Sequence, residues 1–170
     1  ADGVMVARGD LGVQLPLEQV PFVQKQILDA ANKKGKISIT ATEMLQSMKS
    51  SYRPTRAEVT DITNAILEGS DAVMLSAETS IGDNPNRVVE VMSLICKETD
   101  SKNDTSSLLS KENTSEDSTA TLARAAVQVA NEIQAKAIVA FTETGRTPLL
   151  ISNFRPQAEI ITFSTKKKTL

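Results

Sequence analysis

Short apolar runs alternate with amphipathic stretches along the first hundred residues. Three of these runs are typical of buried strands, which we predict at residues 2–7, 37–42 and 72–76. The segment after each run repeats its apolar residues with helical spacing, so we predict helices over about residues 21–34, 56–68 and 86–99. Strands that alternate with helices favour a parallel sheet in an α/β fold.

Local signals support the ends of these helices. The sequence Thr55-Arg-Ala-Glu58 matches a capping box, and glycine follows two of the predicted helices at Gly35 and Gly69. Pro16 and Pro21 both suit the first turn of a helix, so we expect a short helical turn before the helix at 21–34.

The composition changes after residue 100. Residues 101–118 are polar and rich in serine, which is typical of a linker. Beyond them the pattern predicts a helix at 119–134, a strand at 137–141, a helix near 148–153 and a strand at 159–163. We therefore divide the chain into a first α/β unit at 1–100, a linker at 101–118 and the beginning of a second α/β unit at 119–170.

Composition excludes several classes of function. The net charge is −2 and no basic stripe is present, which argues against nucleic acid as a partner. The sequence contains no run of 18 apolar residues, so we predict no membrane-spanning helix. The chain has no histidine, so histidine-dependent triads are excluded within it. The single cysteine, Cys96, allows no internal disulfide, and we interpret it as a core residue.

Polar residues follow all three predicted strands of the first unit. The strands lead into Arg8-Gly9-Asp10, Thr40-Ala-Thr-Glu43 and Ser76-Ala-Glu-Thr79. Active sites of α/β proteins lie at the carboxyl ends of their strands. Three polar strand ends therefore indicate a shared pocket at one edge of the sheet.

The residue types suggest roles in that pocket. Asp10 offers a carboxylate suited to Mg²⁺ or Mn²⁺, and Gly9 allows its backbone to approach a ligand closely. Thr42 offers a hydroxyl that can bind a carboxylate or pass a proton. Structural alternatives are a cap or salt bridge for Asp10, a strand residue for Thr42 and a packed hydroxyl for Ser76.

A second candidate site follows the strand at 137–141. Hydroxyls, a glycine and an arginine gather before a predicted helix, an arrangement that could cradle a phosphate group. The residues are Thr142, Thr144, Gly145, Arg146 and Thr147. A plain turn is the alternative, and the spacing does not match a nucleotide-binding P-loop.

Four stretches together resemble the pyruvate kinase family: residues 2–12, 41–48, 53–58 and 71–79. The resemblance implies the last three βα units of a catalytic (β/α)₈ TIM barrel, followed by the beginning of the α/β regulatory C-terminal domain. Glu43 and Ala77 depart from the family's usual glutamine and glycine. The family's catalytic lysine, its second metal carboxylate and its K⁺ site would precede residue 1.

The resemblance also implies roles for individual residues. Asp10 would bind the divalent metal, and the backbone amides of Gly9 and Asp10 would meet the carboxylate of phosphoenolpyruvate. Thr42 would bind that carboxylate and protonate the enolate, with Ser76 near the same proton path. Residues 142–147 would form a loop that binds a sugar-phosphate effector.

For the whole protein, the resemblance implies phosphoryl transfer from phosphoenolpyruvate to ADP, giving pyruvate and ATP with Mg²⁺ and K⁺. It also implies a homotetramer. We expect a cytoplasmic location, with an organelle such as a plastid as the alternative. We expect this chain alone to be inactive. Two other hypotheses remain open: another metal-dependent barrel enzyme acting on a 2-oxo acid or enolpyruvate, such as an aldolase, and a non-catalytic regulatory fragment that binds a sugar phosphate.

Overall fold

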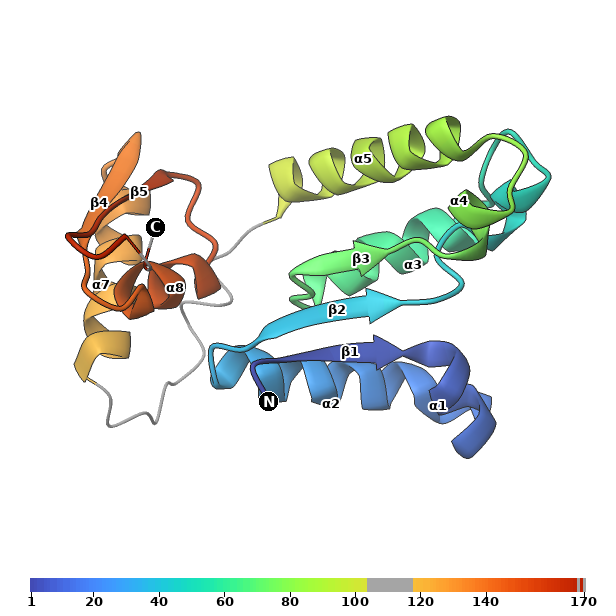
Figure 1. Cartoon of the computed structure of the whole chain (residues 1–170), viewed down its shortest axis with the longest axis horizontal. Helices are drawn as coiled ribbons and strands as arrows, with labels where there is room; N and C mark the ends of the chain where they lie inside the picture. The colour runs from blue at the N-terminus through green and yellow to red at the C-terminus, as the bar shows by residue number, and fades with distance from the viewer. Residues whose placement is uncertain (104–117, 168, 170) are drawn as a thin grey trace. The chain divides into compact units, whose positions relative to one another are not determined.

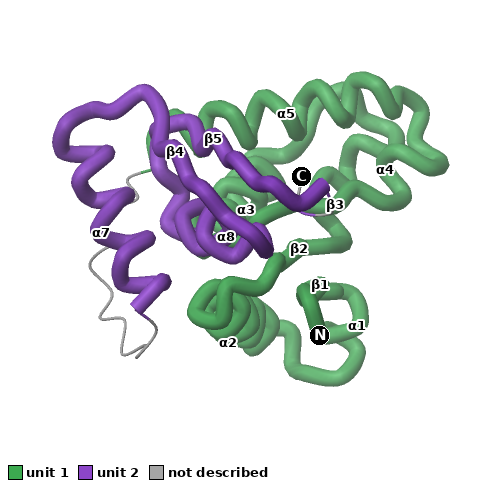
Figure 2. The backbone as a smooth tube through the Cα atoms, turned by 60° about the vertical axis from the view of Figure 1, so that its left-hand side comes forward, with its two compact units in different colours: residues 1–103 green, residues 104–170 purple. Residues whose placement is uncertain are grey.

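The computed structural model describes residues 1–103, 118–167 and 169. The chain divides into two compact units, Ala1–Asn103 and Asp104–Leu170, which are coloured separately in Figure 2. Each unit is an α/β structure with its own parallel sheet and its own hydrophobic core.

Three parallel strands form the sheet of the first unit, in the order β1 (Gly3–Ala7), β2 (Ile37–Ala41) and β3 (Ala72–Met74). They lie side by side in Figure 1. The register pairs Ala7 with Ala41 and Ala41 with Met74, which are the last residues of the three strands. The chain therefore leaves all three strands at one edge of the sheet.

Helices connect and cover these strands. Helix α2 (Val20–Lys33) packs against β1 and β2, whereas α3 (Arg56–Leu67) packs against β3 and against α5 (Pro85–Lys102). The capping box predicted at Thr55 is confirmed, because Thr55 and Glu58 hydrogen-bond each other's backbone nitrogens. Caps and glycine stops are local signals, and the first two predicted helices agree with the structure to within one residue at each end.

The hydrophobic core of the first unit is formed by apolar side chains from the segment after β2, from α3 and from α5. Its fully or almost fully buried members are Met44, Leu45, Met48, Ile62, Ala65, Ile66, Val88, Val91 and Met92. Cys96 packs against this core and is partly buried, in agreement with its interpretation as a core residue. Burial raises the pKa of its thiol, and the nearby charge of Asp100 adds to that effect.

The apolar buried strand predicted at residues 37–42 is not apolar throughout in the structure. Its fully buried positions include Ser38 and Thr40, while Ile37 on the opposite face is 54% exposed. The hydroxyl groups of Thr40 and Ser70 lie 2.9 Å apart, and the Ser38 hydroxyl donates to Asp71. These hydrogen bonds allow polar side chains to be buried beside the sheet.

Four short helical segments refine the predicted pattern. The turn expected after Pro16 is present as η1 (Leu17–Gln19), whereas α1 (Arg8–Gln14), η2 (Gln46–Lys49) and α4 (Ala77–Ser80) were not predicted. Segment α1 escapes prediction because two glycines are unfavourable inside a helix. The third strand ends at Met74 rather than at residue 76.

Helix α5 extends to Lys102, so residues 101 and 102 of the predicted linker are helical. Residues 104–117, which make up most of that linker, lie outside the described residues.

The second unit contains α7 (Ser118–Glu132), β4 (Ala137–Phe141), α8 (Arg146–Asn153) and β5 (Glu159–Phe163). Strands β4 and β5 are parallel and have the predicted bounds, but α8 begins at Arg146 rather than at residue 148. Buried side chains from both helices and β4 form the core, including Ala123, Val127, Ala140 and Ile151. Across the described parts of both units, no helix combines the length and apolar character needed to cross a membrane.

Candidate active site

The carboxyl ends of β1, β2 and β3 gather the predicted site residues at one sheet edge. Because the last residues of the three strands are register partners, Arg8, Thr42 and Leu75 leave the sheet side by side. This confirms the sequence-based expectation that the three strand ends share an edge, and it places the following loops within reach of one another.

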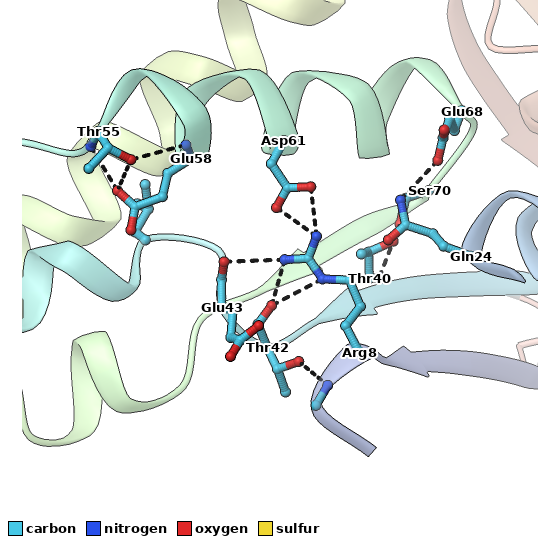
Figure 3. A network of polar contacts seen from close by, with 12 residues as sticks. Arg8, Gln24, Thr40, Thr42, Glu43, Thr55, Glu58, Asp61, Glu68 and Ser70 are labelled. Carbon is cyan, nitrogen blue, oxygen red and sulfur yellow. Dashed lines mark hydrogen bonds and ion pairs between the residues drawn. The ribbon is translucent and has the colours of Figure 1, made fainter. Parts of the chain in front are cut away.

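Gly9 and Thr42 are in direct contact. The backbone N–H of Gly9 donates to the Thr42 hydroxyl oxygen at 3.0 Å, joining the segment after β1 to the segment after β2 (Figure 3). Gly9 and the adjacent Asp10 are exposed, and Thr42 is partly buried. The edge therefore presents a backbone amide, a hydroxyl and a carboxylate close to solvent.

The turn after β2 has an unusual backbone. Thr42 and Glu43 both have positive φ angles, of 73° and 56°. This left-handed region costs non-glycine residues roughly 1–2 kcal/mol each, and a β-branched threonine is rarely found there. Such a turn persists only where its surroundings hold it in place.

Arg8 supplies that support. Its Nη2 atom donates to the carbonyl oxygens of Thr42 at 2.6 Å and Glu43 at 3.2 Å, and its Nε atom donates to Thr42 at 3.2 Å. Its Nη1 atom lies 2.7 and 2.6 Å from the two carboxylate oxygens of Asp61 on α3. The Arg8 side chain, only 11% exposed, thus bridges helix α3 and the left-handed turn (Figure 3).

Glu78 joins the loop after β2 to the loop after β3. Its fully buried carboxylate accepts hydrogen bonds from the backbone nitrogens of Leu45 at 3.1 Å and Ser76 at 2.8 Å. Burial by itself would raise the pKa of Glu78, but hydrogen bonds from backbone N–H groups outweigh it and hold the pKa below its ordinary value of 4.5. The carboxylate is therefore ionised at neutral pH.

Glu58 fixes the same loop from the helix side. Besides capping α3, its carboxylate accepts hydrogen bonds from the backbone nitrogen of Ser47 at 2.7 Å and from its hydroxyl at 2.6 Å. Burial opposes ionisation of Glu58, yet the hydrogen bonds from Ser47 and Thr55 lower its pKa. Between them, Arg8, Glu78 and Glu58 hold the segment from Thr42 to Ser47 at three points.

Asp10 fits a divalent metal in its chemistry. Its carboxylate is exposed and, within the described part of the chain, takes part in no hydrogen bond or ion pair. Among the described residues, no group of three or more carboxylate, cysteine or histidine side chains is arranged so that it could hold a metal ion by itself. Mg²⁺ binds through one or two carboxylates together with water and substrate oxygens, so Asp10 could serve as one ligand.

The second candidate site lies after β4. The backbone nitrogen of Gly145 donates to the Thr142 hydroxyl at 3.0 Å, and Gly145 has a φ of +81° immediately before α8. Glu143 pairs with Lys166 at 3.0 Å, and its carbonyl oxygen accepts from the Thr169 hydroxyl. The loop is therefore an ordered turn at a helix N-terminus, a position that favours anions.

The structure brings some of the predicted residues together and leaves others apart. Gly9, Asp10 and Thr42 share one edge, whereas Ser76 connects to the loop after β2 through Glu78 rather than through Thr42. Residues 142–147 belong to the other unit. Sequence reasoning missed Arg8, Asp61 and Glu78 as supports of the site. Asp61 carries no local signal, since 53 positions separate it from Arg8.

Both units match described protein families. Residues 1–89 match the barrel domain of pyruvate kinase, and residues 120–170 match its alpha/beta domain. A pyruvate kinase from Eimeria tenella is 45% identical over the whole chain, and pyruvate kinase 2 from Synechocystis is 48% identical over 94% of it. The chain spans 33% and 27% of these two relatives.

The chain is also similar to a solved structure of the same family. The crystal structure of a pyruvate kinase from Cryptosporidium parvum matches 99% of the chain with a TM-score of 0.90 and 43% identity, and the chain covers 35% of it. The three strand–helix units of residues 1–103 thus correspond to part of a pyruvate kinase barrel. Matches to both domains, in the same order and at this identity, show that the chain belongs to the pyruvate kinase family.

Proposed function

We propose that this chain forms part of an enzyme that transfers a phosphoryl group from phosphoenolpyruvate to ADP, giving pyruvate and ATP. The observation that carries this proposal is the Gly9–Thr42 contact at the shared strand edge, in a chain of this family. Since the chain spans about a third of its relatives, the remaining site residues would come from a longer protein, called the full-length enzyme below. The chain alone is expected to be inactive.

Binding of the substrate carboxylate is the first role that we propose for this edge. The backbone N–H of Gly9 donates to the Thr42 hydroxyl oxygen at 3.0 Å, so Gly9 holds this hydroxyl in place and the hydroxyl hydrogen can donate to a carboxylate. The backbone N–H of exposed Asp10, in the first turn of α1, adds a second donor that favours an anion. These donors at one exposed edge support binding of a carboxylate there.

Protonation of the enolate is the second role. Loss of the phosphoryl group leaves the enolate of pyruvate, whose methylene carbon must take up a proton. We propose that the Thr42 hydroxyl delivers this proton and regains one from solvent, with Ser76 near the same path. The left-handed turn supports this role because it holds the Thr42 side chain at the strand edge.

Asp10 is the residue of this chain that we propose as a ligand for Mg²⁺ or Mn²⁺. When bound, such an ion would supply positive charge next to the reacting oxygen atoms of the substrate. A carboxylate is a hard oxygen donor, which agrees with either ion. Other ligands would come from the substrate and from the rest of the full-length enzyme.

We also propose that residues 142–147 bind the phosphate group of a sugar-phosphate effector. The support is the ordered turn formed by Thr142 and Gly145, together with Thr144, Arg146 and Thr147 at the start of α8. The hydroxyl groups and the guanidinium can donate to phosphate oxygens.

The direct test compares the full-length enzyme with its Asp10→Ala variant. Pyruvate formation from phosphoenolpyruvate and ADP is measured with Mg²⁺ at matched protein concentration. We expect rapid turnover by the wild type and a decrease of about 100-fold or more in the variant, because one metal ligand is lost. Equal rates would refute the role of Asp10 but leave the reaction standing. A wild type without turnover would refute the reaction and favour the aldolase or the regulatory hypothesis.

A further inference from the structure

The position of Thr42 depends on a residue that contacts its backbone. Thr42 and Glu43 form two consecutive left-handed residues, an arrangement that neither side chain favours by itself. The carbonyl oxygens of both residues point toward the guanidinium of Arg8, which donates to each of them (Figure 3). Changing the φ angles of this turn would break these hydrogen bonds.

Asp61 in turn orients Arg8. Its two carboxylate oxygens lie 2.7 and 2.6 Å from the same nitrogen, Nη1, which leaves Nε and Nη2 directed at the turn. The planar guanidinium makes all these contacts in one fixed geometry, which the compact ammonium group of lysine could not reproduce. Asp61 lies on α3, so the turn is anchored through Arg8 to a helix rather than to another loop.

Arg8 and Gly9, which follow β1 directly, thus hold the carbonyl group and the hydroxyl group of Thr42. Arg8 holds its carbonyl group, and Gly9 binds its hydroxyl through the backbone N–H. We infer that Arg8 is a positioning residue for the proposed reaction, and that the Arg8–Asp61 pair fixes the left-handed turn so that the Thr42 hydroxyl faces the substrate. This inference rests on the proposed function.

The test measures the proton step separately from phosphoryl transfer. In the full-length enzyme, exchange of the pyruvate methyl protons with deuterium oxide, followed by proton NMR, reports reversible enolate formation. Turnover and KM for phosphoenolpyruvate are measured in parallel. The variants are Arg8→Lys, Asp61→Asn and Thr42→Ala, and each of the first two is also combined with Thr42→Ala. Glu98→Gln, which removes an exposed ion pair with Lys102 on α5, is the matched control.

We expect Arg8→Lys and Asp61→Asn to slow methyl-proton exchange about tenfold to 100-fold, since a small misplacement of a reacting group has effects of this size. KM for phosphoenolpyruvate should rise by a smaller factor than the exchange rate falls, because Thr42 is one of the donors proposed for the substrate carboxylate. The Glu98→Gln control should behave as the wild type. In the Thr42→Ala background, the same substitutions should have little further effect, because the group they position is absent.

Four results would overturn the inference. Folded Arg8→Lys and Asp61→Asn variants with normal exchange would show that the pair does not position Thr42. Effects that multiply with that of Thr42→Ala would show that the pair acts independently of Thr42. If both variants lose their circular dichroism spectrum, the pair supports the fold rather than the site. A wild type with no phosphoenolpyruvate-dependent ATP formation would instead refute the proposed function itself, and this inference with it.

Discussion

The carboxylate of Glu78 accepts a hydrogen bond from the backbone nitrogen of Leu45 at 3.1 Å, although 33 positions separate the two residues. The other oxygen of this carboxylate accepts from the backbone of Ser76, so one buried side chain joins the loops that follow β2 and β3. The shape of the candidate site therefore depends on an ionised group beneath its surface.

Glu78→Gln should destabilise the first unit by about 2–3 kcal/mol. The substitution keeps the size of the side chain, but it removes the charge and turns an amide NH₂ toward backbone N–H donors. Urea unfolding of the full-length enzyme, followed by circular dichroism, should show an earlier transition. Glu90→Gln is the matched control, because Glu90 is exposed and, among the described residues, pairs with neighbouring Arg87 on α5. Its effect should stay within about 0.5 kcal/mol. Equal transitions for both variants would contradict the role of Glu78.

Acid should reduce the stability contributed by Glu78 and Glu58. The folded state lowers the pKa of both groups below 4.5, so at acidic pH the unfolded state binds more protons than the folded state. Their contribution is complete above pH 4.5 and disappears as the pH falls through the folded-state values. The difference in urea midpoint between the wild type and Glu78→Gln should therefore shrink on acidification from about pH 6 to about pH 3. A difference that stays constant over this range would argue against an ionised Glu78.

Thr42→Val should lower turnover by the full-length enzyme about 100-fold or more, with little change in folding. Valine keeps the branched shape at a φ of 73° but removes the hydroxyl that we propose as the proton donor. Thr42→Ser retains that hydroxyl and its contact with Gly9, so turnover should remain within about tenfold of the wild type. ATP formation from phosphoenolpyruvate measures both variants. Equal losses in the two would show that shape rather than the hydroxyl matters.

Gly145→Ala should destabilise the loop before α8 by about 1–2 kcal/mol and raise the sugar-phosphate concentration needed for an effect on turnover. The destabilisation would come from the backbone, because the φ of Gly145 is +81°. Steric crowding is not the reason, since among the described residues an added Cβ would meet the Thr169 methyl group at an ordinary contact distance of 3.5 Å. Gly145→Asn is the matched comparison and should be milder, since asparagine tolerates the left-handed region. Thermal unfolding and titration with fructose bisphosphate measure the two effects. An alanine variant that matches the wild type in both would count against the proposed loop function.

Sequence patterns predicted the secondary structure correctly where the interactions that stabilise an element lie within a few residues of it. The bounds of β4 and β5 and the capping box at Thr55 and Glu58 agree with the predictions from sequence. Apolar runs, caps and glycine stops act within a few residues, and short-range chemistry therefore fixes these elements. The sequence likewise indicated that Gly9, Asp10 and Thr42 would share an edge, because parallel strands align their carboxyl ends.

Only the tertiary structure decided how that edge is held together. The Arg8–Asp61 pair spans 53 positions and the Glu78–Leu45 contact spans 33, so both depend on strand register and helix packing. The left-handed conformation of Thr42 and Glu43 opposes their intrinsic preferences and follows from these distant contacts. The sequence by itself determined which groups reach the edge, and long-range contacts with charged side chains determined their geometry.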